Sequence, residues 1–222
     1  IVTGATIGTA VHAIIEKYVL NSLGKDVTAV DKKLQEIANG VYNEADPIDL
    51  TSFDWLTDNI KRIFRKLDLN FFEENVAAAD KDKMLPEAIV HSPIMGIATT
   101  IDGLIEHFNG DLSIIDWKSG NRFLDDATAA KLLAYGSQYI DINDSQLSRA
   151  KMEIMLRAIM IKELNPDARF RKLSVVHLTK AKVLRGLIDP LEVETDSYLS
   201  AIEAYFKNEN PEVYQALQEK GL

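Results

Sequence analysis

Two aspartates and a lysine stand where short apolar segments end, and together they could form a hydrolytic centre. Asp116 and Lys118 close the apolar segment 114–118, and Asp102 lies in the segment before it. Side chains two residues apart in a strand point to the same face, so Asp116 and Lys118 are expected to lie together. Burying such charges beside apolar residues is costly unless they are paired or bind a metal.

Two carboxylates and a lysine are the groups that phosphodiester hydrolysis requires. Carboxylate oxygens suit hard cations such as Mg²⁺ or Mn²⁺. Such an ion polarises a phosphoryl oxygen and lowers the pKa of a bound water. A lysine can orient that water and stabilise developing negative charge. By itself, however, an Asp-x-Lys pair is more often an inert, solvated pair at a strand end, so the surrounding sequence must decide.

A predicted β-hairpin brings Asp102 beside Asp116. The sequence predicts three strands, at residues 87–91, 94–108 and 111–118. Asn109-Gly110 separates the last two and is a strong signal for a two-residue hairpin turn. The hairpin therefore places the two carboxylates on neighbouring strands.

Helical periodicity dominates on both sides of the hairpin. Helices are predicted at residues 8–23, 28–42, 54–76, 125–137, 144–164, 196–207 and 211–220, and further strands at 173–178 and 185–193. This order predicts an α/β (α+β) fold with a central mixed sheet flanked by helices. We expect one domain over residues 1–222, with a mainly helical part at 1–84, a catalytic core at 85–193 and C-terminal helices at 194–222.

Composition excludes several classes of protein. The 222 residues include no cysteine, which excludes disulfides, cysteine-ligated zinc and cysteine-held iron–sulfur clusters. No apolar run is long enough to span a membrane. The formal net charge of −9 argues against a large non-specific DNA-binding surface. Local basic clusters at 61–66, 169–172 and 180–185 could still contact nucleic acid, or could be solvated faces.

Four segments, in order, resemble the RecB-like branch of the PD-(D/E)XK nucleases, of the phage or mitochondrial-maintenance-exonuclease type without an iron–sulfur cluster. They are the Gly-Thr-x-x-His helix at 8–16, Pro86-Glu87, the Asp strand at 96–106 and the Asp-x-Lys strand at 114–120. The last is the most specific, because its apolar beginning and its Ser-Gly end also fit. The resemblance implies a restriction-endonuclease-like core and spans about residues 4 to 180.

The resemblance also implies roles for individual residues. The implied metal ligands are His12, Asp102, Asp116 and the Trp117 backbone carbonyl. Lys118 would act on the attacking water, and Asp102, Asp116 and Lys118 would form the catalytic centre. Glu87 would join the catalytic carboxylates by binding a second metal or supporting a ligand, and the alternative is an ordinary glutamate at a strand start.

The helix after the Asp-x-Lys strand departs from the family pattern. The family usually has Gln-x-x-x-Tyr there, whereas the best placement in this sequence puts Glu153 and Arg157 at those positions. Arg157 could pair with a phosphate, or the two residues could form a helical salt bridge. With Thr9 of the first motif, they are the candidate substrate-binding residues.

These features predict a Mg²⁺- or Mn²⁺-dependent deoxyribonuclease, an exonuclease or a single-strand or flap nuclease in DNA recombination, repair or processing. The expected partner is DNA, a helicase or other recombination or replication protein is a further candidate, and no membrane is expected. The expected location is the cytoplasm of a bacterial or phage-infected cell, with mitochondrion and nucleus left open. The alternatives are an inactive nucleic-acid-binding or structural module and a hydrolase of RNA or another phosphodiester.

Overall fold

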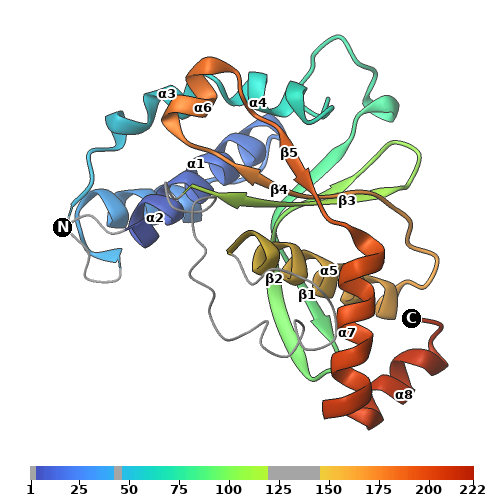
Figure 1. Cartoon of the computed structure of the whole chain (residues 1–222). Coiled ribbons are helices and arrows are strands. Elements are labelled where there is room, and N and C mark those ends of the chain that lie inside the picture. Colours follow the sequence, from blue (N-terminus) through green and yellow to red (C-terminus); the bar gives the residue numbers. More distant parts are fainter. Residues whose placement is uncertain (1–3, 43–46, 120–145) are drawn as a thin grey trace.

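A five-stranded mixed sheet forms the centre of the computed structural model, which describes residues 4–42, 47–119 and 146–222 (Figure 1). The strands are β1 (Lys83–Ser92), β2 (Ile97–Glu106), β3 (Leu112–Lys118), β4 (Phe170–His177) and β5 (Pro190–Glu192), in that spatial order. Only the β3–β4 pair is parallel among the strand pairs of the described residues. Helix α5 (Gln146–Leu164) lies between these two strands in sequence, as a crossover between parallel strands requires.

Helices cover both faces of this sheet (Figure 1). One face packs against α1 (Gly4–Ser22), α2 (Thr28–Ala38), α3 (Asp54–Thr57), α4 (Ile60–Lys66) and α6 (Lys180–Arg185). The other packs against α5, α7 (Thr195–Glu209) and α8 (Pro211–Glu219). Short 3-10 helices occupy Leu50–Phe53 and Ala78–Asp80. The predicted α/β fold, with a mixed sheet and a helical N-terminal region, is confirmed.

The helix predicted at 54–76 is wrong in its length. Residues 54–66 form α3 and α4, and the chain turns at Asp68, whose backbone is left-handed with φ 58°. A right-handed helix cannot include that conformation. The apolar stripe nevertheless continues inward, because Phe71 folds back to pack edge-on against Phe64, with ring centroids 5.0 Å apart.

The strand predicted at 185–193 is largely wrong. Helix α6 comes first, because the Thr179 hydroxyl accepts a hydrogen bond from the Lys182 amide and Gly186 ends the helix at φ 71°. Only β5 remains as strand. The predicted helix at 125–137 lies outside the described residues.

The hairpin between β2 and β3 is confirmed, but its loop has three residues instead of the predicted two. The His107 amide donates to the Asp111 carbonyl across 2.8 Å, and Gly110 takes φ 83° inside this closing pair. A three-residue loop that ends in a left-handed glycine is a common hairpin type.

Strands β1 and β2 change faces beside the predicted site. Ile101 packs on the α5 side, whereas Gly103 lies against Met84 on the α1 side, although two residues of a regular strand share a face. A Cβ at Gly103 would come within 2.8 Å of the Met84 side chain. Opposite Asp102, Glu87 has a left-handed backbone with φ 49°. The change of face in β1 and β2 therefore occurs at Glu87 and Asp102.

Candidate active site

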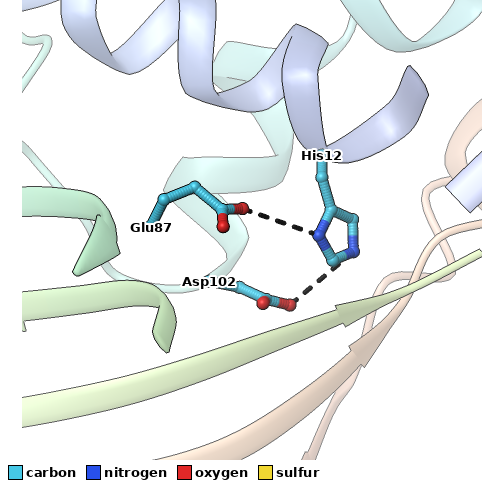
Figure 2. A group of neighbouring side chains, drawn as sticks. All are labelled: His12, Glu87 and Asp102. Carbon is cyan, nitrogen blue, oxygen red and sulfur yellow. Dashed lines mark ion pairs between the residues drawn. The ribbon is translucent and has the colours of Figure 1, made fainter. Parts of the chain in front are cut away.

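Three side chains from three elements converge beside the end of β3. His12 extends from α1, Glu87 from β1 and Asp102 from β2 (Figure 2). His12 Nε2 lies 3.6 Å from Asp102 Oδ2, and His12 Nδ1 lies 3.8 Å from Glu87 Oε1. Both separations are those of ion pairs and exceed hydrogen-bond length. One potential ligand atom from each residue lies within 4.8 Å of the other two.

The backbone of Trp117 closes this cluster from β3. Its amide donates to Asp102 Oδ2 across 2.9 Å, and its carbonyl accepts from His12 Nε2 across 2.9 Å. The Trp117 side chain points away and packs in the α1-side core, where its ring lies edge-on to Phe64. One residue of β3 therefore fixes both the carboxylate and the imidazole through its backbone, as alternation in a strand allows.

Burial and neighbouring charge shift the pKa values in the cluster. Burial raises the pKa of Asp102, and the nearby Asp116 charge adds to this. The His12 imidazolium lowers the pKa of Glu87. Burial alone would lower the pKa of His12, but Glu87, Asp102 and the Trp117 carbonyl together raise it above its usual value. The cluster thus concentrates negative charge around one imidazole, which favours a cation.

Asp116 and Lys118 lie next to the cluster and pair with each other. Asp116 is 1% exposed, and its Oδ2 lies 2.7 Å from Lys118 Nζ. That contact is an ion pair without hydrogen-bond alignment, since Asp116 Oδ2 has no hydrogen-bond partner. The expectation that the two side chains share a face of β3 is confirmed. Asp116 does not belong to the group of three potential ligands that includes His12.

Helix α5 supplies a cation to the same carboxylate. Arg157 Nη1 lies 2.9 Å from Asp116 Oδ1, while its Nη2 lies 3.9 Å from Glu153 Oε2. The expected helical salt bridge is therefore present as a long contact, and the short contact crosses to β3. Glu153 is 54% exposed. Thr9 lies on α1, where its hydroxyl donates to the Ala5 carbonyl.

A cavity of about 440 Å³ opens beside the cluster. Its lining includes His12, Glu87 and Lys118, together with Thr9 and the first turn of α1. Two further side chains on its wall, Lys33 of α2 and Tyr42, were not among the residues selected from the sequence.

Neither of these two residues belongs to a motif. Lys33 is one cation on an amphipathic helix, and Tyr42 follows that helix without a neighbouring signal. Only the packing of α2 against α1 brings them to the cavity.

The donor set fits a divalent cation. An imidazole nitrogen, two carboxylates and a backbone carbonyl are ligand types that Mn²⁺ accepts, and Mg²⁺ takes the same oxygens. His12 Nε2 lies 2.9 Å from the Trp117 carbonyl and 3.6 Å from Asp102 Oδ2, so these groups could hold one ion together. Ligands from three strands and one helix would meet at such an ion.

Several residues of the basic clusters predicted from the sequence have partners within the fold. Arg65 Nε pairs with Glu73 at 2.6 Å, and Lys172 pairs with Asp68 at 3.0 Å. Arg62 donates to the backbone carbonyl of Val183. The two alternatives for these clusters, contact with nucleic acid or a solvated face, stay open.

A second histidine–carboxylate group lies farther along the same strands. His107 Nδ1 lies 3.0 Å from Asp82 Oδ1, and His107 Nε2 lies 2.8 Å from the Ser113 hydroxyl. All three side chains are buried. Asp82 also exchanges hydrogen bonds with Asn70. Both ring nitrogens are thus within hydrogen-bond reach of a partner, and this group joins β1 to the β2–β3 hairpin.

Residues 2–139, more than half of the chain, match the PD-(D/E)XK nuclease superfamily. The chain belongs to this superfamily. The matched region contains His12, Glu87, Asp102, Asp116 and Lys118, and the mixed sheet with helices on both faces is the restriction-endonuclease-like fold expected for it. Members of this superfamily generally use divalent metals and act on nucleic acids. This PD-(D/E)XK chain is therefore a nuclease. Its assignment to the RecB-like branch stays a prediction.

Solved structures give weaker similarities. A protein from Eubacterium rectale, named as a candidate exonuclease, aligns over 93% of this chain and 67% of its own, with 12% identity and a TM-score of 0.48. The protein SSO0001 aligns over 91% of this chain and 77% of its own, with 11% identity and a TM-score of 0.26. No curated protein sequence matches the chain significantly. None of the helices in the described parts of this PD-(D/E)XK nuclease is long and apolar enough to cross a bilayer.

Proposed function

We propose that the chain is a divalent-metal-dependent deoxyribonuclease, an exonuclease or a single-strand or flap nuclease that acts in DNA recombination, repair or processing. The observation that supports this most is the convergence of His12, Glu87 and Asp102 on a cavity that Lys118 also lines. Superfamily membership supports nucleic acid as the substrate. Specificity for DNA, and one domain over 1–222, are part of the proposal.

In this proposal, His12, Glu87, Asp102 and the Trp117 carbonyl hold Mg²⁺ or Mn²⁺. Such an ion supplies Lewis-acid polarisation of a phosphoryl oxygen and a more acidic water. Asp116 contributes its Oδ2, the oxygen without a hydrogen-bond partner, either to the ion or to Lys118.

Lys118 then serves the reacting phosphate. Its side chain lines the cavity and is 31% exposed, and its ammonium group pairs with Asp116. It can donate hydrogen bonds to the attacking water and stabilise the charge that develops on phosphate oxygens. Holding these groups in place before the substrate arrives is the contribution of the chain's own residues.

The cavity also supports contacts to the rest of a nucleotide. Lys33 carries positive charge on the same cavity wall as Glu87, and its charge helps to lower the pKa of that carboxyl. We propose that Lys33 contacts a neighbouring phosphate and that Tyr42 stacks on a base, as aromatic side chains do with single strands. Thr9 lines the same cavity, while Glu153 and Arg157 act from α5.

Cleavage assays with labelled single-stranded, double-stranded and flap DNA test this proposal, with RNA as a further arm. Wild-type protein should cleave DNA with Mg²⁺ or Mn²⁺ and lose activity in EDTA. Asp116→Ala and Lys118→Ala should each lower the rate by about 10²–10³-fold. Lys83→Ala is the control, because Lys83 is 69% exposed and, among the described residues, its ion pair is with Glu106. Equal cleavage by wild type and both variants would reject the catalytic assignment.

A second candidate is an inactive module that binds nucleic acid or has a structural role. The arginine at position 157, where the family usually has tyrosine, favours this candidate, and so does the net charge of −9. DNA binding without metal-dependent cleavage would support it. A helicase or other recombination partner, and a cytoplasmic location, are further proposals that follow from the RecB-like resemblance alone.

A further inference from the structure

Asp116 already has a cation at each of its oxygens. Arg157 lies 2.9 Å from Oδ1 and Lys118 lies 2.7 Å from Oδ2. Because Asp116 is 1% exposed and Arg157 is 11% exposed, solvent screens this pairing weakly. The guanidinium of Arg157 therefore belongs to the electrostatics of the site.

The position of Arg157 matters because a second carboxylate is close. Asp102 lies on the neighbouring strand, and the charge of Asp116 contributes to its raised pKa. Two adjacent carboxylates attract cations, and in two-metal nucleases the ions lie about 3.5–4 Å apart. In this chain Arg157 already supplies positive charge at Asp116 Oδ1.

Arginine can supply that charge but cannot act as a ligand. Its guanidinium stays protonated and has only donors, so it offers no atom to a metal. A permanent cation that contacts Asp116 Oδ1 also repels a divalent ion from that oxygen. The family's usual tyrosine at this position carries no such charge.

We propose that Arg157 takes the place of a second metal ion, so that the centre binds a single divalent ion at His12, Glu87 and Asp102. Arg157 holds Asp116, and Asp116 in turn holds Lys118 at the cavity wall. Arg157 is thus a positioning residue. The inference rests on the metal centre of the proposed function and does not require cleavage.

Counting bound ions tests this inference without a substrate. The metal-free full chain is titrated with Mn²⁺, and the ions are counted by calorimetry and by the loss of the free-Mn²⁺ EPR signal. Wild type should bind one ion per chain, Arg157→Gln two, and Arg157→Lys one, because lysine restores the charge. Lys162→Gln is the matched control, since Lys162 is a cation of α5 that lines a separate cavity. It should bind one ion.

Each result decides between the alternatives. Two ions in wild type would overturn the inference, and this count does not depend on whether any variant folds. One ion in a folded Arg157→Gln variant, with unchanged affinity, would also overturn it and leave Arg157 a purely structural contact. One ion without DNA cleavage would reject the proposed nuclease activity and keep this inference. Binding of no ion would reject the metal centre itself.

Discussion

His12 and His107 each lie beside carboxylates in or next to the strands β1 to β3, yet their surroundings differ. His107 has Asp82 at 3.0 Å and Ser113 at 2.8 Å, and its side chain is 4% exposed. His12 is 24% exposed, its two carboxylates stay 3.6 and 3.8 Å away, and a cavity of about 440 Å³ opens beside it. Similar residue types therefore build a closed network in one place and an open one in the other.

The contrast shows which observation separates a structural histidine from one that can bind a ligand. A buried polar group stabilises a fold when each of its atoms has a partner. The His107 group meets that condition, because both ring nitrogens of His107 already have partners and neither is left to bind a ligand. In the His12 group, burial raises the pKa of Asp102, and the charge of the neighbouring Asp116 adds to this. A bound cation would relieve this unfavourable arrangement.

The largest difference between the groups should appear when Asp102 loses its charge. We expect Asp102→Asn to lower DNA cleavage by about 10²–10³-fold, through loss of a metal ligand. Its stability should stay equal or rise, because a buried charge is removed while an oxygen remains for the Trp117 amide. Cleavage rates and urea unfolding of the same preparation measure both effects. If Asp102→Asn unfolded more easily than wild type but cleaved DNA normally, Asp102 would have the structural role that is expected of the His107 group.

The opposite result is expected in the closed group. His107→Ala should lower the free energy of unfolding by about 3 kcal/mol, because Asp82 Oδ1 stays buried without its histidine partner. The folded fraction should retain its metal affinity, as read by Mn²⁺ titration at low temperature. Ser113→Ala removes only the other partner and should cost about 1 kcal/mol. If His107→Ala abolished metal binding in folded protein, the two groups would not be independent.

A smaller effect is expected for the open histidine. His12→Gln should weaken Mn²⁺ binding by at least about 10- to 100-fold, because that range is found when a group that only supports a metal ligand is lost, and His12 is proposed as a ligand. Calorimetric titration measures this change. The control is His91→Gln, on the exposed side of β1, which should leave the affinity unchanged. Equal affinities of the His12 variant and wild type would remove His12 from the site.

The smallest effect concerns backbone strain at Glu87. Its φ of 49° is unfavourable for a residue with a side chain, so Glu87→Gly should unfold about 1 kcal/mol less readily than Glu87→Gln. Both variants lose the carboxylate and should bind metal equally weakly. Thermal or urea unfolding compares them. A glycine variant no more stable than the glutamine variant would show that the strand does not store strain for the site.

Much of this site follows from short patterns in the sequence. The hairpin and its Asp-x-Lys strand depend on residues within a few positions of one another, so periodicity and turn chemistry suffice to predict them. Only the resemblance to the nuclease family implied that His12 and the Trp117 carbonyl would join Asp102. The class of fold follows for the same reason.

Other features depend on contacts between distant segments. The left-handed Glu87 results from two strands changing faces together, and Lys33 and Tyr42 reach the cavity only because α2 packs on α1. The interaction of Arg157 with Asp116 crosses from a helix to a strand.

The sequence by itself thus determined which residues could do chemistry, because motif, turn and strand patterns are local. The tertiary structure alone decided which histidine is left open and which carboxylate receives an arginine. The physical reason is that burial and partner geometry arise from packing between segments far apart in the chain.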